Sequence, residues 1–151
     1  MKPVAALLAL ALPLAAAAQP VAFHDAGGIA YACGGVGSDE RRALETLRRN
    51  ASLELLFVTA KRGGYTAGTQ VVMTPVSGGA PASFRAGGPT CVVRAPAGRY
   101  RIEATLDGHT RAASVQVPAR GKAARVVMTF PDEAGDDIRA SDEEKREAAE
   151  P

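Results

Sequence analysis

The sequence is poor in aromatic side chains: its 151 residues include no tryptophan, three tyrosines and four phenylalanines. A hydrophobic core must therefore be built mainly from aliphatic side chains, and the length leaves room for one domain of modest size. Stacking platforms for bases or sugar rings are few; the candidates outside the expected core are Phe23, Tyr31, Tyr65 and Phe84. We therefore expect no nucleic-acid binding, and we rank carbohydrate binding second among the candidate functions.

Histidine is also scarce, with His24 near the N-terminus and His109 beside an Asp-Gly pair. No serine stands where either histidine could activate it; Ser114 falls on the opposite face of its expected strand from His109. Two histidines and two cysteines without ligand spacing do not predict a zinc site. The sequence thus favours a protein that is not an enzyme and that needs no cofactor or metal.

The sequence lacks an apolar run long enough to cross a membrane as a stable anchor, and this includes the apolar run near the N-terminus. Residues 1–18 begin with Lys2, continue as an apolar run over 4–14 and end in small residues at 16–18. This pattern is typical of a secretory signal peptide cleaved after Ala18. We therefore expect a periplasmic or secreted protein without a transmembrane anchor after cleavage.

Two cysteines, Cys33 and Cys91, remain in the expected mature chain. In an oxidising compartment an even number of cysteines favours a disulfide. Closing a loop of roughly 60 residues would stabilise the fold by about 4 kcal/mol in the chain-entropy view. The alternative is that Cys91 is a small buried apolar residue, because it shares a core-facing side of its expected strand with Val93.

The clearest local signal is the Asp107-Gly108 pair, which is typical of a two-residue type I′ turn because both residues need a positive φ. It predicts a hairpin in which Leu106 lies opposite His109. One face of this hairpin is then apolar away from the turn and the other is polar, so a slip of one residue would exchange the faces of one strand. The expected apolar face carries Tyr100, Ile102, Ala104, Ala113 and Val115.

Two polar residues beside this turn, His109 and Arg111, fall on the face that is otherwise apolar. Their side chains would line one end of a sandwich. We therefore mark them as a candidate contact patch, with a plain hairpin tip as the alternative.

Short apolar stretches separated by glycine and proline predict further strands over 53–59, 69–75, 83–85 and 90–95. After a turn at 118–121, residues 122–130 are expected to pair with 109–117 and to continue the apolar face. A parallel βαβ architecture would need helices between the strands, and none fit there. The spacing therefore favours an all-β sandwich.

Three segments carry a resemblance to a known family: Gly-Thr-Gln-Val-Val-Met at 68–73, Ala-Pro-Ala-Gly-Arg-Tyr at 95–100 and Glu-Ala-Thr-Leu-Asp-Gly-His at 103–109. They resemble the carboxypeptidase regulatory-like domain, a transthyretin-like (prealbumin-like) fold. Its usual turn is Leu-Pro-Pro-Gly-x-Tyr, from which Ala95 and Ala97 depart. The lead-in at 31–40 resembles that of small exported bacterial proteins bearing this domain. The resemblance implies a Greek-key β-sandwich of about seven antiparallel strands and says little about function.

The resemblance, together with the leader pattern and the charge distribution, divides the chain into a signal peptide at 1–18, a glycine-rich segment with one short helix at 19–52, the sandwich at 53–131 and an acidic tail at 132–151. The helix is expected over 38–49, with Ser38 as its N-cap. We expect it to dock on the Leu56/Val58 side of the first sandwich strand, either as a lid or as a partner-facing element. The glycines before it are similar to a phosphate-binding loop but lack its lysine, so we expect a turn.

Charge is divided unevenly along the chain. Residues 19–131 hold 14 basic and 7 acidic side chains, a net charge of +7, whereas residues 132–151 hold 3 and 9, a net charge of −6. This composition predicts a tail that is disordered or forms a fraying helix starting at Ser141, which has capping-box spacing to Glu144. The tail could serve only for solubility, or it could lie over the basic body and compete with an anionic partner.

Taken together, these features favour a non-catalytic accessory or protein-binding module of the bacterial cell envelope. Its partner would be contacted through loops or through a free sheet edge. A small-ligand or carbohydrate-binding sandwich is the alternative, and an enzyme comes third.

Overall fold

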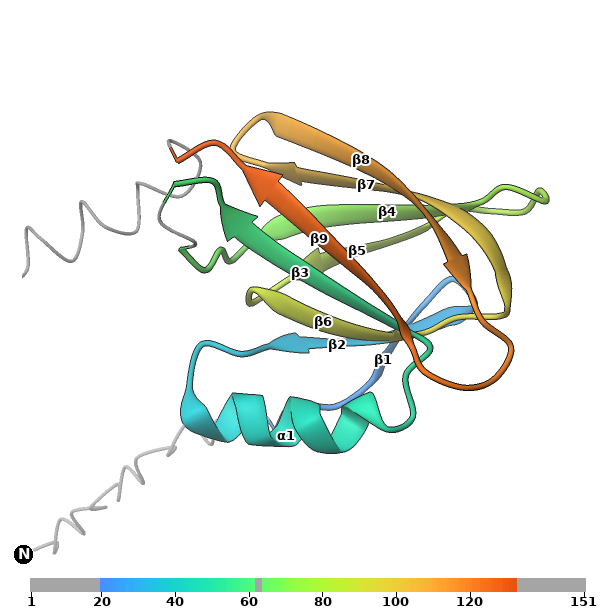
Figure 1. Ribbon diagram of the computed structural model, residues 1–151, viewed down its shortest axis with the longest axis horizontal. Coiled ribbons are helices and arrows are strands. Elements are labelled where there is room, and N and C mark those ends of the chain that lie inside the picture. Colours follow the sequence, from blue (N-terminus) through green and yellow to red (C-terminus); the bar gives the residue numbers. More distant parts are fainter. Residues whose placement is uncertain (1–19, 62–63, 133–151) are drawn as a thin grey trace, which may run out of the picture.

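The computed structural model describes residues 20–61 and 64–132, and within these ranges nine strands and one helix form two packed sheets (Figure 1). The all-β sandwich predicted from the sequence is confirmed. The predicted signal peptide and the acidic tail beyond residue 132 lie outside the described residues.

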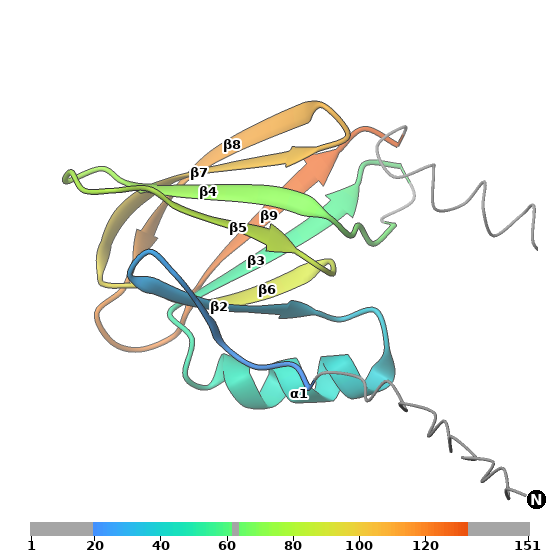
Figure 2. The same ribbon diagram turned by 180° about the vertical axis from the view of Figure 1, so that it is seen from behind.

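The five-stranded sheet has the order β1-β2-β6-β3-β9. Its strands are β1 (His24–Ala26), β2 (Ile29–Gly34), β6 (Thr90–Arg94), β3 (Leu53–Thr59) and β9 (Ala124–Phe130). The four-stranded sheet has the order β5-β4-β7-β8. Its strands are β5 (Ala82–Ala86), β4 (Thr69–Pro75), β7 (Gly98–Leu106) and β8 (His109–Val117). The helix α1 (Ser38–Arg48) covers part of the outer face of the five-stranded sheet, as both views show (Figures 1 and 2).

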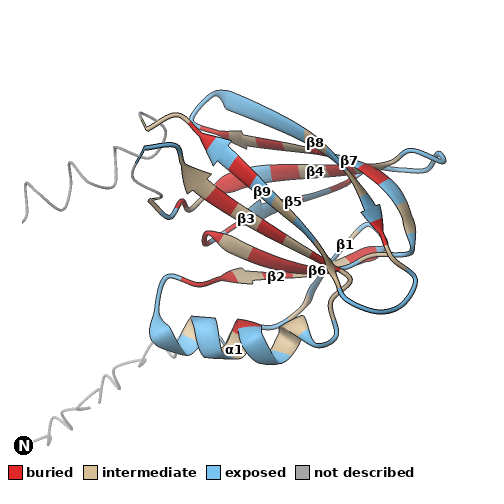
Figure 3. Ribbon diagram, viewed as in Figure 1, coloured by how far each residue is buried: buried red, intermediate tan, exposed pale blue. Residues whose placement is uncertain are grey.

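The core lies between the two sheets and is mostly aliphatic, as the shortage of aromatic residues predicted. Buried and exposed residues alternate along most strands, which is the pattern of sheets with one face toward the core (Figure 3). The largest fully buried side chains include Leu53, Leu55, Phe57, Met73, Ile102 and Phe130. The predicted inward orientation of Tyr100 and Ile102 is confirmed, and Val115 packs half-buried against the same core.

The β7–β8 hairpin has the predicted turn and the predicted register. Asp107 and Gly108 have φ values of 47° and 78°, as a type I′ turn requires. Pairing runs without interruption from Leu106↔His109 to Gly98↔Val117. Local turn chemistry and apolar alternation therefore suffice to specify this part of the fold.

The predicted pairing of β9 with β8 is wrong. β9 belongs to the other sheet and pairs in parallel with β3, from Leu53↔Ala124 to Thr59↔Phe130, so the sandwich is not wholly antiparallel. The loop after Val117 crosses between the sheets instead of closing a hairpin. Alternation did identify the core-facing side of β9 correctly, because Met128 and Phe130 are buried in either arrangement.

The segment before residue 53 contributes more than a lead-in and a helix. β1 and β2 form a hairpin, and β2 pairs with β6 inside the five-stranded sheet. The helix packs on the predicted face of the sheet, the outer face that Leu56 shares with Glu54, but it lies over β2 and β6, where Leu44 meets Ala32 and Val92, and not over β3. The strands under the helix were predicted wrongly because β2, which supplies part of that surface, was not recognised as a strand.

Tyr100 joins the core to the turn between β6 and β7. Its side chain is 6% exposed, and its hydroxyl donates a hydrogen bond of 2.8 Å to the carbonyl oxygen of Pro96. Burial raises the pKa of the Tyr100 phenol above its ordinary value of 10.0. The last residue of the Ala-Pro-Ala-Gly-Arg-Tyr segment thus stabilises the turn formed by the residues before it.

The Tyr100→Phe variant is expected to unfold with a free energy about 1 kcal/mol lower at neutral pH, because it loses this hydrogen bond. In the native state the Tyr100 phenol keeps its proton to a higher pH than it does in the unfolded chain, where its pKa is about 10. Stability of the wild type therefore falls as the pH rises past that value, and its advantage over the variant narrows. Urea denaturation at pH 7 and above pH 10 measures both effects. Tyr65→Phe, at a side chain 67% exposed, is the control; a constant gap at all pH values would contradict the argument.

Candidate interaction surface

The two residues of the predicted contact patch, His109 and Arg111, both lie exposed at the start of β8. The Arg111 side chain reaches across to the other sheet: its Nε donates a hydrogen bond of 2.9 Å to the carbonyl oxygen of Thr129 on β9. A second nitrogen, Nη1, donates at 3.4 Å to the carbonyl oxygen of Thr110. Arg111 therefore joins the two sheets at this corner, a role that sequence reasoning missed because β9 was assigned to the wrong sheet.

β8 is an edge strand of the four-stranded sheet. A two-residue turn closes on a hydrogen-bonded pair, so backbone groups of every second residue of β8 point toward β7 and the others point away. The outward-pointing groups belong to Thr110, Ala112, Ser114 and Gln116. Within the described residues none of these four makes a backbone hydrogen bond on that side. Arg111 donates a hydrogen bond to the carbonyl oxygen of Thr110. The outward-pointing backbone groups of Ala112, Ser114 and Gln116 are left unpaired within the described part of the chain, and we call these three residues the β8 edge.

The β8 edge has few of the features that usually protect a free strand: Arg111 is charged at one end and β9 lies beside it. Such edges are normally short, bulged, charged or interrupted by proline. The side chains of Ala112, Ser114 and Gln116 are exposed and uncharged, and the pairing of β8 with β7 contains no bulge.

The other three edges have protecting features of their own. β1 has three residues and β5 has five, and β5 lies beside β1 and β2. β9 carries Arg125 on its outer face, and its Thr129 carbonyl is occupied by Arg111. β8 also lies beside β9, but with nine residues and an uncharged outer face it is the longest of the described edge strands available to pair with another chain.

A second surface is formed by three adjoining hollows around the C-terminal end of α1, with volumes of about 320, 470 and 320 Å³. The first lies between α1, β3 and β9, and the last lies beside the loop between β8 and β9. Two carboxylates, Glu45 and Glu54, line them together with seven cations. These cations, which define the basic groove, are Arg41, Arg48, Arg49, Arg94, Arg120, Lys122 and Arg125.

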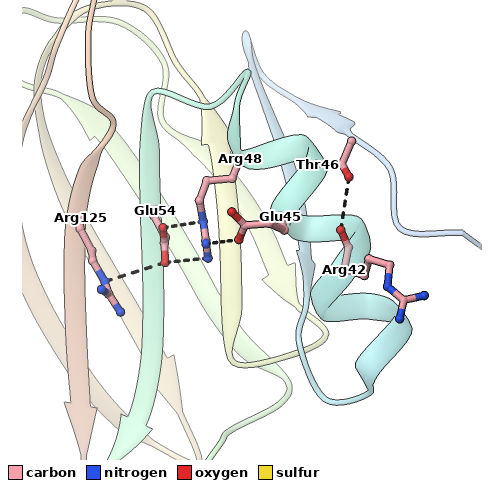
Figure 4. A network of polar contacts seen from close by, with 6 residues as sticks. All are labelled: Arg42, Glu45, Thr46, Arg48, Glu54 and Arg125. Atoms are coloured by element: carbon pink, nitrogen blue, oxygen red, sulfur yellow. Dashed lines mark hydrogen bonds and ion pairs between the residues drawn. The ribbon is translucent and has the colours of Figure 1, made fainter.

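Glu54 neutralises part of the basic groove (Figure 4). Its side chain is 14% exposed and pairs with Arg48, with 3.0 Å between Arg48 Nε and Glu54 Oε2 and a hydrogen bond of 3.2 Å from Arg48 Nη2 to Oε1. Arg125 Nε lies further away, at 3.8 Å from Glu54 Oε1. Arg48 also pairs with Glu45 on its own helix, so it ties α1 to β3 and is not available to a ligand.

The other cations of the groove are less committed. Within the described residues, Arg49, Arg120 and Lys122 form no ion pair and are exposed. The Arg94 guanidinium lies 4.1 Å from the centre of the Phe23 ring, a cation–π contact that leaves its charge unneutralised. The groove therefore keeps a strong net positive charge.

The glycine-rich loop before α1 is occupied by the chain itself. The backbone N–H groups of Gly35 and Val36 both donate to Glu40 Oε2, each at 3.0 Å. The predicted N-cap is wrong: Gly37 precedes the helix, Ser38 is its first residue, and no side chain caps it. The Glu40 carboxylate takes the place that a bound anion would need, so this loop is structural.

Cys33 and Cys91 form a disulfide, as one of the two interpretations predicted. They lie directly opposite each other on β2 and β6. Cys91 is also fully buried in the core, so the second interpretation correctly described its environment. Among the described residues, no group of three or more His, Cys, Asp or Glu side chains is placed to hold a metal ion.

Of the four aromatic side chains considered for ligand stacking, one is freely accessible. Tyr31 and Phe84 stack on each other with ring centres 4.3 Å apart, and Phe23 lies under Arg94. Tyr65 is 67% exposed and lines the first hollow of the basic groove. A sugar would thus find one aromatic platform beside the groove.

Comparison with known protein families found no family model that matches the chain, and comparison with curated proteins found no significant match. No helix within the described ranges is long and apolar enough to cross a membrane. The function must therefore be argued from the geometry of the β8 edge and the basic groove.

Proposed function

We propose that this protein is a non-catalytic, exported β-sandwich module that binds a protein partner of the bacterial cell envelope by strand addition at the β8 edge. The signal-peptide pattern of residues 1–18 and the Cys33–Cys91 disulfide support export. The resemblance to carboxypeptidase regulatory-like domains supports a periplasmic or secreted module of this kind. The observation that carries the proposal is the unprotected row at Ala112, Ser114 and Gln116.

Strand addition suits this edge for two physical reasons. Backbone hydrogen bonds supply the affinity, and each outward-facing residue of β8 offers one N–H and one C=O. Specificity comes from the side chains next to the added strand. Here these are uncharged on the outer face, so the edge can accept many sequences, and His109 lies exposed at one end of the strand.

The alternative function is binding of a small ligand or carbohydrate. The exposed Tyr65 ring beside the basic groove favours it, because a sugar ring can stack on tyrosine while its acidic groups meet the arginines. A single accessible aromatic makes a weak platform. We therefore place this function second.

A photoreactive amino acid at position 114 is expected to crosslink an envelope protein in intact cells, and the same group at Gln70 is not. Gln70 is exposed on β4, an inner strand of the same sheet, so it shares the face but not the edge. Mass spectrometry of the adducts identifies the partner.

The Ser114→Pro variant supplies the decisive control. Proline removes an N–H that points away from β7, so the sandwich keeps its own ladder while an added strand cannot pair there. We expect crosslinking from a neighbouring photoreactive position, 116, to fall at least about tenfold, as loss of one or two backbone hydrogen bonds implies. Unchanged crosslinking in Ser114→Pro, or a glycan-array hit without any protein adduct, would contradict strand addition.

A further inference from the structure

The basic groove is a second surface that strand addition at β8 does not use. It collects seven of the cations in the described part of the chain around three connected hollows, next to two carboxylates. One of those carboxylates, Glu54, is already paired with Arg48. A surface with this excess of positive charge fits a flexible anion longer than a single phosphate.

We infer that the occupant of the basic groove is the acidic C-terminal segment of the same chain, residues 133–151. This segment carries eight acidic and three basic side chains, a net charge of −5. The groove holds seven cations and two carboxylates, a net charge of +5. The two charges are equal and opposite, and the segment is tethered to the surface it complements.

The geometry places the start of this segment within reach of the groove. β9 begins at Ala124 beside the hollows and ends at Phe130, and the N–H of Lys61 holds Asp132 by a hydrogen bond of 2.9 Å to Oδ1. The seven residues of β9 span about 23 Å. Ten extended residues after Asp132 span about 33 Å, so the acidic run at 142–144 can return along β9 to the groove.

A tether of this length gives the acidic run a local concentration in the millimolar range. Weak contacts between exposed charges, each insufficient alone, then suffice to keep the groove covered. The contact is electrostatic, so salt weakens it, and at 1 M salt the screening length is about 3 Å. Docking of the tail hides the groove from other anions, and an acidic partner must displace it.

The test is zero-length carbodiimide crosslinking of the full mature chain at low salt, followed by peptide mass spectrometry. Lys122 is the lysine of the groove, and we expect it to join carboxylates of 142–150 within one molecule. The Arg49→Glu/Arg120→Glu variant should lower the yield of this crosslink about fivefold or more, because two exposed contacts become repulsions. High salt should lower the wild-type yield as well.

The matched control is Arg85→Glu/Arg99→Glu. These arginines are exposed on the four-stranded sheet, form no ion pair within the described residues and change the net charge equally. Melting curves establish that both double variants fold. Equal crosslinking of Lys122 in the two variants, absence of the crosslink in the wild type, or its occurrence only between molecules would each overturn the inference. None of these outcomes bears on the β8 edge.

Discussion

The Cys33→Ala/Cys91→Ala variant is expected to have a free energy of unfolding about 4 kcal/mol below that of the wild type. The two cysteines are 58 residues apart in sequence, so the disulfide removes a large loop-closure entropy from the unfolded chain. It also fastens β2 to β6, and β2 carries β1 and part of the surface under α1. Urea denaturation of oxidised protein measures the loss.

Reduction of the wild type is the internal control. A reducing agent should bring the wild type close to the double variant and leave the variant itself unchanged. Hydrogen exchange should then rise first in β1, β2 and α1, while the β7–β8 hairpin stays protected. Equal stability of oxidised and reduced wild type would show that the disulfide contributes nothing beyond the packing of its strands.

The Gly88→Ala variant is expected to lose about 3 kcal/mol of stability, the upper end of the usual effect of overpacking. A Cβ atom at position 88 would lie 2.4 Å from the carbonyl oxygen of Gly34, and its other close neighbours are also backbone atoms of Gly34. Backbone in a paired strand cannot rotate aside as a flexible side chain can. The approach of β2 to the segment before β6 therefore needs glycine at position 88. Thermal or urea denaturation measures the loss.

The adjacent residue offers a control with the same chemical change. A Cβ at Gly87 meets nothing within 4 Å, and its φ is not in the left-handed region. We expect Gly87→Ala to be neutral or slightly stabilising, because alanine restricts the unfolded chain more than glycine does. Similar stabilities for the two variants would mean that β2 does not lie as close to Gly88 as the structure places it.

Sequence reasoning was accurate where local chemistry decides the structure. The Asp107-Gly108 turn set the register of β7 and β8, because a positive φ at two consecutive residues leaves few alternatives. The strands at Leu53–Thr59 and Thr69–Pro75 were bounded correctly by glycine and proline. In each case neighbours in sequence carry the signal.

It failed where the partner is distant in sequence. Alternation showed which side of β9 faces the core, but the same alternation is compatible with pairing to β8 or to β3. β1 was missed because it has three residues, and β2 was missed because the glycines around it weaken the apolar pattern. The Ser38 cap was wrong because the helix already begins at Ser38, and Glu40 fixes the preceding loop by accepting hydrogen bonds from Gly35 and Val36.

The candidate surfaces show the same division. His109 and Arg111 were identified from their positions in the hairpin, and their contact role stays a prediction, whereas the Arg111 bond to Thr129 depends on the crossing of β9. The basic groove draws its cations from α1 and the residue after it, from β6, from the loop before β9 and from β9 itself, which are far apart in sequence. Net charge could be counted from the sequence, but its concentration along one groove could not.

The sequence alone determined that this chain is a mostly β domain with an aliphatic core, a basic body, an acidic tail and two cysteines able to pair. The tertiary structure alone decided that β9 joins β3, that β8 is left as an open edge and that seven cations surround one groove. The reason is physical: turn chemistry and alternation act between neighbouring residues, whereas strand order and surface charge depend on which distant segments the closed core brings together.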